Sequence, residues 1–183
     1  LGFAQLLEFN PKEPLTKAQK ESVQHILQRG NHLLELINEV LELARIDNIA
    51  GIKEASGNLV QIMRILQEKP SDFLLLSGDD SMTLPMVTMG AEGLISVASN
   101  VIPAEMTEIV KLGRHGELEE ARKLHYRYLD LMELNFVESS PIPVKYALSR
   151  MGKLEEVYRL PLCPMKKENK RTMDQELEKL GLI

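Results

Sequence analysis

The sequence predicts an α/β fold in which helices connect three parallel strands. Short apolar runs occur at Ile49–Ile52, Phe73–Leu76 and Leu94–Val97, and turn residues of the Gly, Ser or Asp type close them. Helix-like stretches lie between the runs, at Leu59–Gln67 and Met82–Met89. Strand–helix–strand units of this length imply parallel strands that are joined by right-handed crossovers.

The composition is that of an ordinary globular protein, since 44% of the 183 residues are apolar and 27% are charged. The net charge of -5 leaves no basic excess to neutralise phosphates, which argues against a nucleic-acid partner. The single Cys163 excludes a disulfide framework, and no apolar run is long enough for a membrane span. We therefore expect a cytoplasmic protein. The chain starts at Leu1 without an initiator Met or a signal peptide, as in a fragment, a processed product or an engineered protein.

Residues 1–47 carry only helical signals. An amphipathic helix is expected to end near Leu7, because Pro11 and Pro14 cannot continue it. Thr16 followed by Gln19 is a capping-box pattern, which opens a second helix of about thirty residues. The chain therefore begins, in this interpretation, with a helical hairpin.

The second helix of the hairpin has an apolar stripe in alternating steps of three and four residues. The stripe consists of Val23, Ile26, Gly30, Leu33, Ile37, Val40 and Ala44. This rhythm suits a coiled coil or a four-helix bundle, although packing on the chain's own core gives a similar pattern. From the length and regularity of the stripe we expect a partner helix, and hence a homodimer through the N-terminal helices.

The chain is predicted to be helical again after residue 102. Pro103 marks a helix start, Glu117–Val137 forms a long helix, and Pro143–Met151 forms a shorter one. Residues 159–171 are expected to form an irregular loop rich in Pro and Lys, followed by a last helix at Met173–Leu180. The sequence contains no internal repeat.

Lys53 is the candidate catalytic residue, because it lies on a short apolar strand just before the glycine turn at Gly57. A lysine in such a strand is costly unless it is paired or burial keeps its amine neutral. A neutral amine attacks a keto group and forms a Schiff base. The alternative from this pattern alone is a solvated lysine at the end of an edge strand.

Residues 48–183 resemble dihydrodipicolinate synthase, a pyruvate-dependent class I lyase. The ordered motifs are Gly51-Ile52-Lys53-Glu54-Ala55-Ser56-Gly57-Asn58, Leu76-Ser77-Gly78-Asp79-Asp80, Gly93-Leu94-Ile95-Ser96-Val97 and Pro141-Ile142-Pro143-Val144-Lys145-Tyr146-Ala147. The resemblance implies that Lys53 is the Schiff-base lysine and that Gly78 and Ile95 line the substrate pocket. Pyruvate is then the implied small-molecule partner, and no cofactor is implied.

The resemblance also implies the fold, since the family has an eight-stranded (β/α) barrel and this chain resembles its last three strands and C-terminal helices. The expected architecture is a partial (β/α) barrel of three parallel strands, covered by the N-terminal hairpin. No residue in 1–47 matches the family's threonine pair, proton-shuttling tyrosine or carboxylate-binding arginine. Ser140 precedes Pro141 where the family usually has Asn.

Residues 1–47 resemble instead the dimerisation and phosphoacceptor hairpin of sensor histidine kinases. The motifs are Leu1-Gly2-Phe3-Ala4-Gln5-Leu6-Leu7 and His32-Leu33-Leu34-Glu35-Leu36-Ile37-Asn38-Glu39-Val40-Leu41-Glu42-Leu43-Ala44-Arg45-Ile46. The two resemblances divide the chain into residues 1–47 and 48–183. A seam near Arg45–Asn48 suggests an engineered or recombined chimera.

Three hypotheses follow. The first is a structural chimera that keeps the Schiff-base lysine without the full native activity, and this hypothesis favours a protein that is not an enzyme over one that is. The second is residual class I aldolase or lyase activity, in which Lys53 forms an imine with pyruvate. The third is a dimerisation module. A metal site is not expected, because the adjacent Asp79 and Asp80 suit a helix start, and His115 and His125 have no ligand spacing.

Overall fold

The computed structural model describes residues 15–183, and along 26–38 it describes the helical backbone without the side chains. The chain divides into two compact units. One comprises residues 15–50 and Val60–Phe73 of the described chain, and the other comprises Gly51–Leu59 and Leu74–Ile183. None of the described helices is long and apolar enough to cross a membrane.

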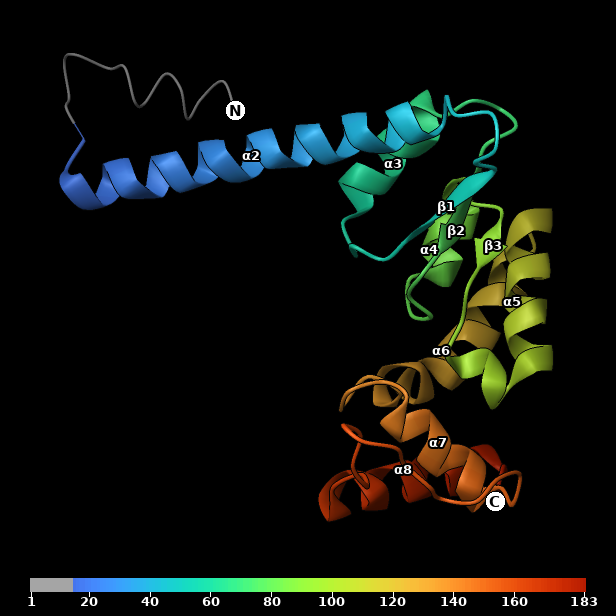
Figure 1. Cartoon of the computed structure of the whole chain (residues 1–183). Coiled ribbons are helices and arrows are strands. Elements are labelled where there is room, and N and C mark those ends of the chain that lie inside the picture. Colours follow the sequence, from blue (N-terminus) through green and yellow to red (C-terminus); the bar gives the residue numbers. More distant parts are fainter. Residues whose placement is uncertain (1–14) are drawn as a thin grey trace. The chain divides into compact units, whose positions relative to one another are not determined.

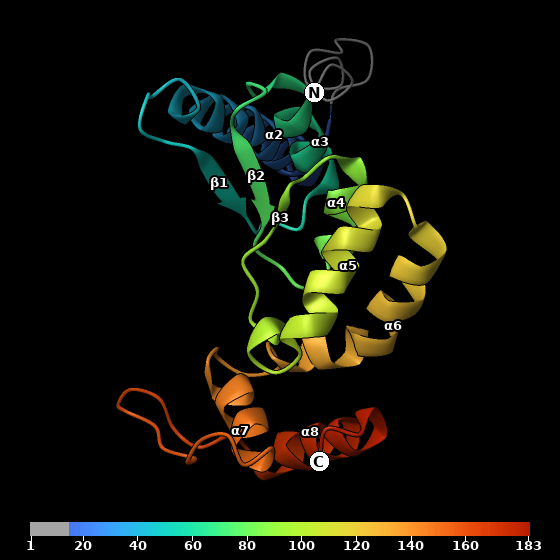
Figure 2. The same ribbon diagram turned by 90° about the vertical axis from the view of Figure 1, so that its right-hand side faces the viewer.

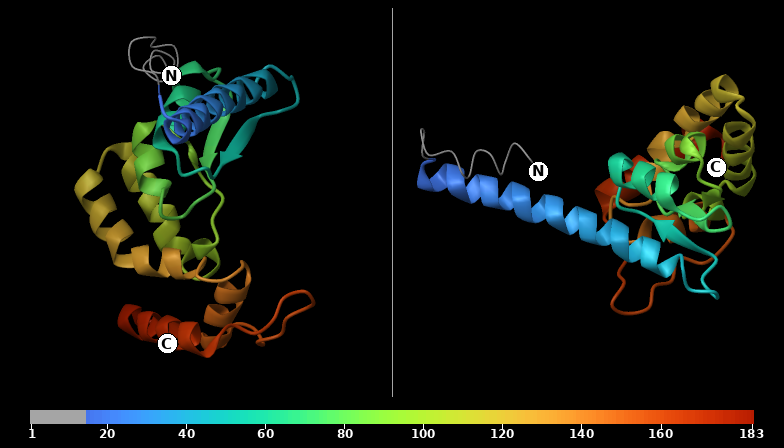
Figure 3. Two further views of the ribbon diagram at one scale, coloured as in Figure 1. Left: turned by 90° about the vertical axis from the view of Figure 1, so that its left-hand side faces the viewer. Right: turned by 90° about the horizontal axis from the view of Figure 1, so that it is seen from above.

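The first unit contains the long helix α2 (Lys17–Leu43), which runs without a break (Figure 3, right). Its N-terminus has the predicted capping box, because the Gln19 amide donates to Thr16 Oγ1 at 3.4 Å and the Thr16 amide donates to Gln19 Oε1 at 2.9 Å. Two of the four amides that have no partner within the helix are thereby satisfied. The expected first helix of the hairpin falls within residues 1–14, outside the described part, so the hairpin is not confirmed.

Helix α3 (Leu59–Glu68) follows in the sequence, and most of it belongs to the same unit. Its apolar residues Ile62 and Ile65 are fully buried, as is nearly all of Phe73 beyond the helix. The spacing of three residues places both isoleucines on one face of the helix. The prediction of a helix over 59–67 is therefore confirmed.

The second unit is built on a parallel three-stranded sheet in the order β1-β2-β3 (Figure 2). The strands are β1 (Gly51–Glu54), β2 (Leu74–Ser77) and β3 (Gly93–Leu94). The first strand begins two residues later than the apolar run at Ile49–Ile52 predicts. Lys53 and Glu54 join the strand because they pair with Leu76 and Ser77 of β2, a contact that hydrophobicity alone does not reveal.

Helix α4 (Thr83–Met89) contacts the second and third strands, and α5 (Pro103–His115) packs against it. Gly113 of α5 makes the close approach possible, since a Cβ at this position would lie 3.1 Å from Val87 and 3.2 Å from Leu84. A short 3-10 helix, η1 (Ala98–Asn100), connects β3 to α5. The expected helix start at Pro103 is confirmed.

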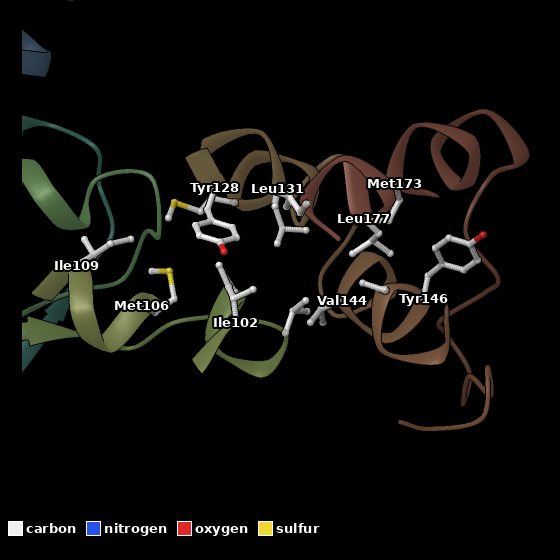
Figure 4. Packing of buried hydrophobic residues seen from close by; sticks show 14 of the residues in the cluster. Ile102, Met106, Ile109, Tyr128, Leu131, Val144, Tyr146, Met173 and Leu177 are labelled. Carbon is white, nitrogen blue, oxygen red and sulfur yellow. The ribbon is translucent and has the colours of Figure 1, made fainter. Parts of the chain in front are cut away.

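The remaining helices are α6 (Leu118–Leu134), α7 (Ile142–Arg150) and α8 (Lys167–Leu180), which follow α5 along the chain (Figure 1). Helices α5 and α6 lie along each other, and α8 packs on both α6 and α7. Figure 4 shows one apolar core that runs through all four helices. Its fully or nearly fully buried members include Met106, Ile109, Leu131, Met173 and Leu177.

The last helix begins at Lys167 and not at Met173, so the irregular loop predicted over 159–171 is shorter than expected. The cause is a tertiary cap. Glu138 Oε1 accepts hydrogen bonds from the Lys166 amide at 2.9 Å and from Asn169 Nδ2 at 2.7 Å. An acceptor 28 residues away thus binds the backbone amide of the N-cap residue Lys166 and the side chain of Asn169, which no local pattern of the sequence indicates.

Candidate active site around Lys53

The first strand presents its last two side chains to opposite faces, as the pleat of a strand requires. Lys53 is exposed, whereas Glu54 is only 6% exposed. Glu54 Oε1 accepts a hydrogen bond from the Ser56 amide at 2.9 Å, which closes the turn after the strand. Gly57 follows with φ at +68°, a conformation that favours glycine. The local sequence thus ends the strand at Glu54, one residue after the lysine.

Gly78 lies beside the lysine, at the end of the second strand. Its amide donates to the Glu54 carbonyl at 2.6 Å, which extends the β1–β2 pairing by one residue. A Cβ at position 78 would lie 2.8 Å from Lys53 Cε and 3.0 Å from Lys53 Cγ. The aliphatic part of the lysine therefore occupies the space that the missing side chain leaves.

Ile95 lies at the same edge of the sheet, directly after the third strand. Its amide donates to the Ser77 carbonyl at 2.8 Å, so it directly neighbours the end of the second strand. Its side chain is 49% exposed. The three residues that the sequence singles out, Lys53, Gly78 and Ile95, thus follow one another across the carboxyl ends of β1, β2 and β3. In parallel sheets this is the edge at which ligands bind.

Asp80 holds the loops of this edge together. Its side chain is 1% exposed, and its Oδ2 accepts hydrogen bonds from the Val97 amide at 3.1 Å and the Ala98 amide at 2.9 Å. The carboxylate from the loop after β2 therefore fixes the start of η1 and the segment that contains Ile95. The other oxygen, Oδ1, is buried without a hydrogen-bond partner.

The carboxylates of Asp79 and Asp80 accept hydrogen bonds from different groups, and together they do not form a metal site. Asp79 Oδ1 accepts from the Ser81 amide at 2.9 Å and from Ser81 Oγ at 2.8 Å, which is a local turn. No group of three or more His, Cys, Asp or Glu side chains within the described part of the chain has the geometry to hold a metal ion.

Two buried carboxylates, Glu54 and Asp80, are absent from the sequence-based list of site residues. Each keeps one oxygen buried and without a partner. Glu54 directly follows the lysine in a short strand that is otherwise apolar, and this position is the one sequence feature by which Glu54 could have been selected. The burial of Asp80 has no such signal, because it depends on amides 17 and 18 residues away.

The remaining polar candidates lie elsewhere. Cys163 is a free, exposed thiol, and His115 is exposed. His125 is 4% exposed, and burial is the main cause that lowers the pKa of its imidazole. The hydroxyl of Tyr146 donates to the Asp174 carboxylate at 3.0 Å, which ties α7 to α8.

The sequence and structure were compared with known proteins. The model of the Dihydrodipicolinate synthetase family matches residues 12–180. The 4-hydroxy-tetrahydrodipicolinate synthase of Pelodictyon phaeoclathratiforme is 55% identical over 145 residues, which are 79% of this chain and 49% of that protein. The chain thus spans about half the length of the curated relatives it matches.

Solved structures agree in fold. Dihydrodipicolinate synthase from Aquifex aeolicus is 40% identical with a TM-score of 0.77, over 80% of this chain and 50% of that one. The chloride-inhibited enzyme from Acinetobacter baumannii, solved in complex with pyruvate, is 32% identical with a TM-score of 0.78. That match covers 80% of this chain and 50% of the other.

These relatives contradict the hypothesis of an engineered or recombined structural chimera without the full native activity. Proteins that are 50–55% identical over 145 residues are named 4-hydroxy-tetrahydrodipicolinate synthase, so this part of the chain resembles native synthases and not a recombined scaffold. The family match begins at residue 12 and therefore includes helix α2. The resemblance of residues 1–47 to histidine kinases is shown by none of these comparisons.

Proposed function

The chain belongs to the dihydrodipicolinate synthetase family, and on this premise we propose that it carries the Schiff-base half of a 4-hydroxy-tetrahydrodipicolinate synthase site, with Lys53 as the nucleophile. The observation that carries the proposal is the placement of Lys53 against Gly78 at the carboxyl ends of two parallel strands. The pyruvate complex of the Acinetobacter baumannii enzyme supports pyruvate as the substrate.

In the proposed chemistry the Lys53 nitrogen attacks the keto carbon of pyruvate in its unprotonated form, because only that form has a lone pair to donate. The carbinolamine that forms loses water, and the C=N double bond of the imine replaces the C=O bond. Gly78 contributes the absence of a side chain, which leaves room for the lysine and for the carbon atoms of the substrate. Ile95, half exposed on the next strand, is proposed as an apolar wall of the same pocket.

Later steps need a group that moves protons, a contribution typically of about 10² to 10⁴ in rate. Tyr146 does not fit this task, because its hydroxyl is engaged by Asp174 between α7 and α8. We therefore propose imine formation and weak aldol or lyase turnover as the activity of these 183 residues.

The test is reductive trapping: the chain is incubated with pyruvate and borohydride, and the intact mass is measured. One reduced pyruvate per chain is expected in the wild type and in Lys153→Ala, which removes an exposed lysine elsewhere. Lys53→Ala should show no adduct. A trapped adduct of equal yield in Lys53→Ala, or no adduct in the wild type at high pyruvate, would refute the proposal.

We further propose that the chain consists of two domains, residues 1–47 and residues 48–183. We also propose that two copies of the chain associate through α2. The apolar stripe of α2 supports the second, since Val23 is buried whereas its neighbours Ser22 and Gln24 are exposed. Sedimentation velocity should give a smaller species for the double variant Leu33→Asp, Ile37→Asp than for Lys20→Asp, which changes an exposed position of the same helix. Equal sedimentation of both variants and the wild type would exclude the stripe as an interface.

A further inference from the structure

A cavity lies between α6 and α8, and its lining does not include Lys53. Its volume is about 560 Å³, within the range of small-molecule sites. Three carboxylates line it, those of Asp130, Glu133 and Glu176, together with one lysine, Lys179. The apolar part of the lining includes Phe136 and Val137, which are 49% and 45% exposed.

The charge of the cavity is negative for two independent reasons. Three carboxylates face a single ammonium, so the lining is formally -2. The cavity also lies at the C-terminal end of α6, where the helix dipole is negative and the last turn contains no basic residue. Both effects favour a bound cation.

Glu176 is the central group. Its side chain is 8% exposed, its Oε2 accepts from Lys179 Nζ at 2.9 Å, and its Oε1 is buried without a hydrogen-bond partner. Leaving a carboxylate oxygen buried and unpartnered is costly, and a donor that reached it would recover part of that cost. Glu176 thus keeps hydrogen-bonding capacity that the described protein groups do not fill.

The ion pairs of Lys179 indicate which kind of cation the carboxylates of the cavity can bind. Its ammonium bridges Glu176 Oε2 and Asp130 Oδ2, at 2.9 Å from each, while its side chain stays 58% exposed. The chain thus places an alkylammonium of its own on two of the three carboxylates. Because the side chain is long and solvated, it can turn away when another cation enters. A metal ion is the poorer fit, since the described carboxylates and imidazoles form no group with metal-binding geometry.

We propose that the cavity between α6 and α8 binds a small organic cation, an alkylammonium whose charged end contacts Glu176 and Asp130 and whose alkyl chain lies on Phe136 and Val137. The site is independent of the proposed imine chemistry. It uses residues of α6, α8 and the segment after α6, whereas Lys53 lies on β1 against Gly78.

The experiment titrates pentylammonium into the full chain and follows backbone amide shifts by NMR. The shifts should concentrate at the ends of α6 and α8, and pentan-1-ol and pentanoate should bind at least about tenfold more weakly, because they lack the charge-assisted donor. Added salt should weaken the binding of pentylammonium. Equal affinities for the amine and the alcohol, or no shifts at these helix ends, would overturn the proposal.

Two variants with opposite expected effects sharpen the test. Glu176→Gln should weaken pentylammonium binding at least about tenfold, whereas Glu178→Gln, which removes the same charge from an exposed position of α8, should not. Lys179→Gln removes the competing internal cation and should tighten binding about fivefold. Unchanged affinity in Glu176→Gln, or weaker binding in Lys179→Gln, would contradict the proposed site even if one variant were less stable.

Discussion

The side chain of Lys53 lies directly on Gly78, so that a Cβ at position 78 would come within 2.8 Å of Lys53 Cε and 2.7 Å of Ala55 Cβ. Distances below 3.0 Å between such atoms force a shift. The lysine is a flexible side chain and can move, but Ala55 Cβ is fixed to the backbone. The position of the proposed nucleophile therefore depends on a glycine 25 residues later in the sequence.

Gly78→Ala should slow imine trapping with pyruvate by about tenfold to a hundredfold, since a displacement of about 1 Å at a reacting atom has an effect of this size. The matched control is Gly93→Ala, whose added Cβ would meet its nearest neighbour, Leu76 Cδ2, at 3.6 Å. The rate in Gly93→Ala should stay close to that of the wild type. Equal rates in both variants would show that the contact between residues 53 and 78 does not position the amine.

Asp80→Ala should lower the free energy of unfolding by about 2–4 kcal/mol, because the partly buried amide of Val97 and the buried amide of Ala98 lose their acceptor. Asp79→Ala removes a local, partly exposed contact to Ser81 and should cost about 1 kcal/mol. Urea denaturation measures both values. A smaller loss in Asp80→Ala than in Asp79→Ala would contradict the role of Asp80 as the connection between the two loops.

Tyr146→Phe should destabilise the chain by about 1 kcal/mol near neutral pH, because the hydrogen bond to Asp174 is lost. Burial, followed by the hydrogen bond to Asp174, raises the pKa of Tyr146 to about 12 from its ordinary value of 10.0. Between these values the folded chain keeps a proton that the unfolded chain releases, so stability should fall as the pH rises through this window.

The alkaline slope of stability should be smaller in Tyr146→Phe than in the wild type. Tyr126→Phe, at a position that is 65% exposed, should keep the wild-type slope. Tyr158, with a pKa also raised to about 12, leaves a residual slope in every variant. Chemical denaturation at several pH values between 9 and 12 measures the difference, and identical slopes in both tyrosine variants would refute the assignment.

His125 should make the chain less stable in mild acid. Burial is the first cause that lowers the pKa of its imidazole below the ordinary value of 6.5. As the pH falls below that value, the unfolded chain takes up a proton that the folded chain does not, so the free energy of unfolding decreases. His125→Gln should flatten this acid slope between pH 6.5 and 5, whereas His115→Gln, at an exposed position, should leave it unchanged. A slope that persists in His125→Gln would contradict the prediction.

The sequence by itself determined the succession of strands and helices and the candidate site. The capping box at Thr16 and the helix start at Pro103 are local signals, because caps depend on residues within one turn. Lys53 could be selected from its place on a short apolar strand before a glycine turn, and Gly78 from the resemblance to a known family. The placement of these two residues side by side follows from parallel pairing, which the alternation of strands and helices predicts.

The tertiary structure decided what depends on groups far apart in the chain. Glu138 caps the helix that starts at Lys167, so the early start of α8 cannot be predicted from neighbouring residues. Asp80 accepts hydrogen bonds from amides beyond the next strand, so its burial cannot be predicted locally either. At the cavity between α6 and α8, the Lys179 ammonium binds the Asp130 carboxylate, which lies 49 residues earlier in the sequence. Burial and charge at such places are set by packing between elements, whereas propensity and periodicity act only within an element.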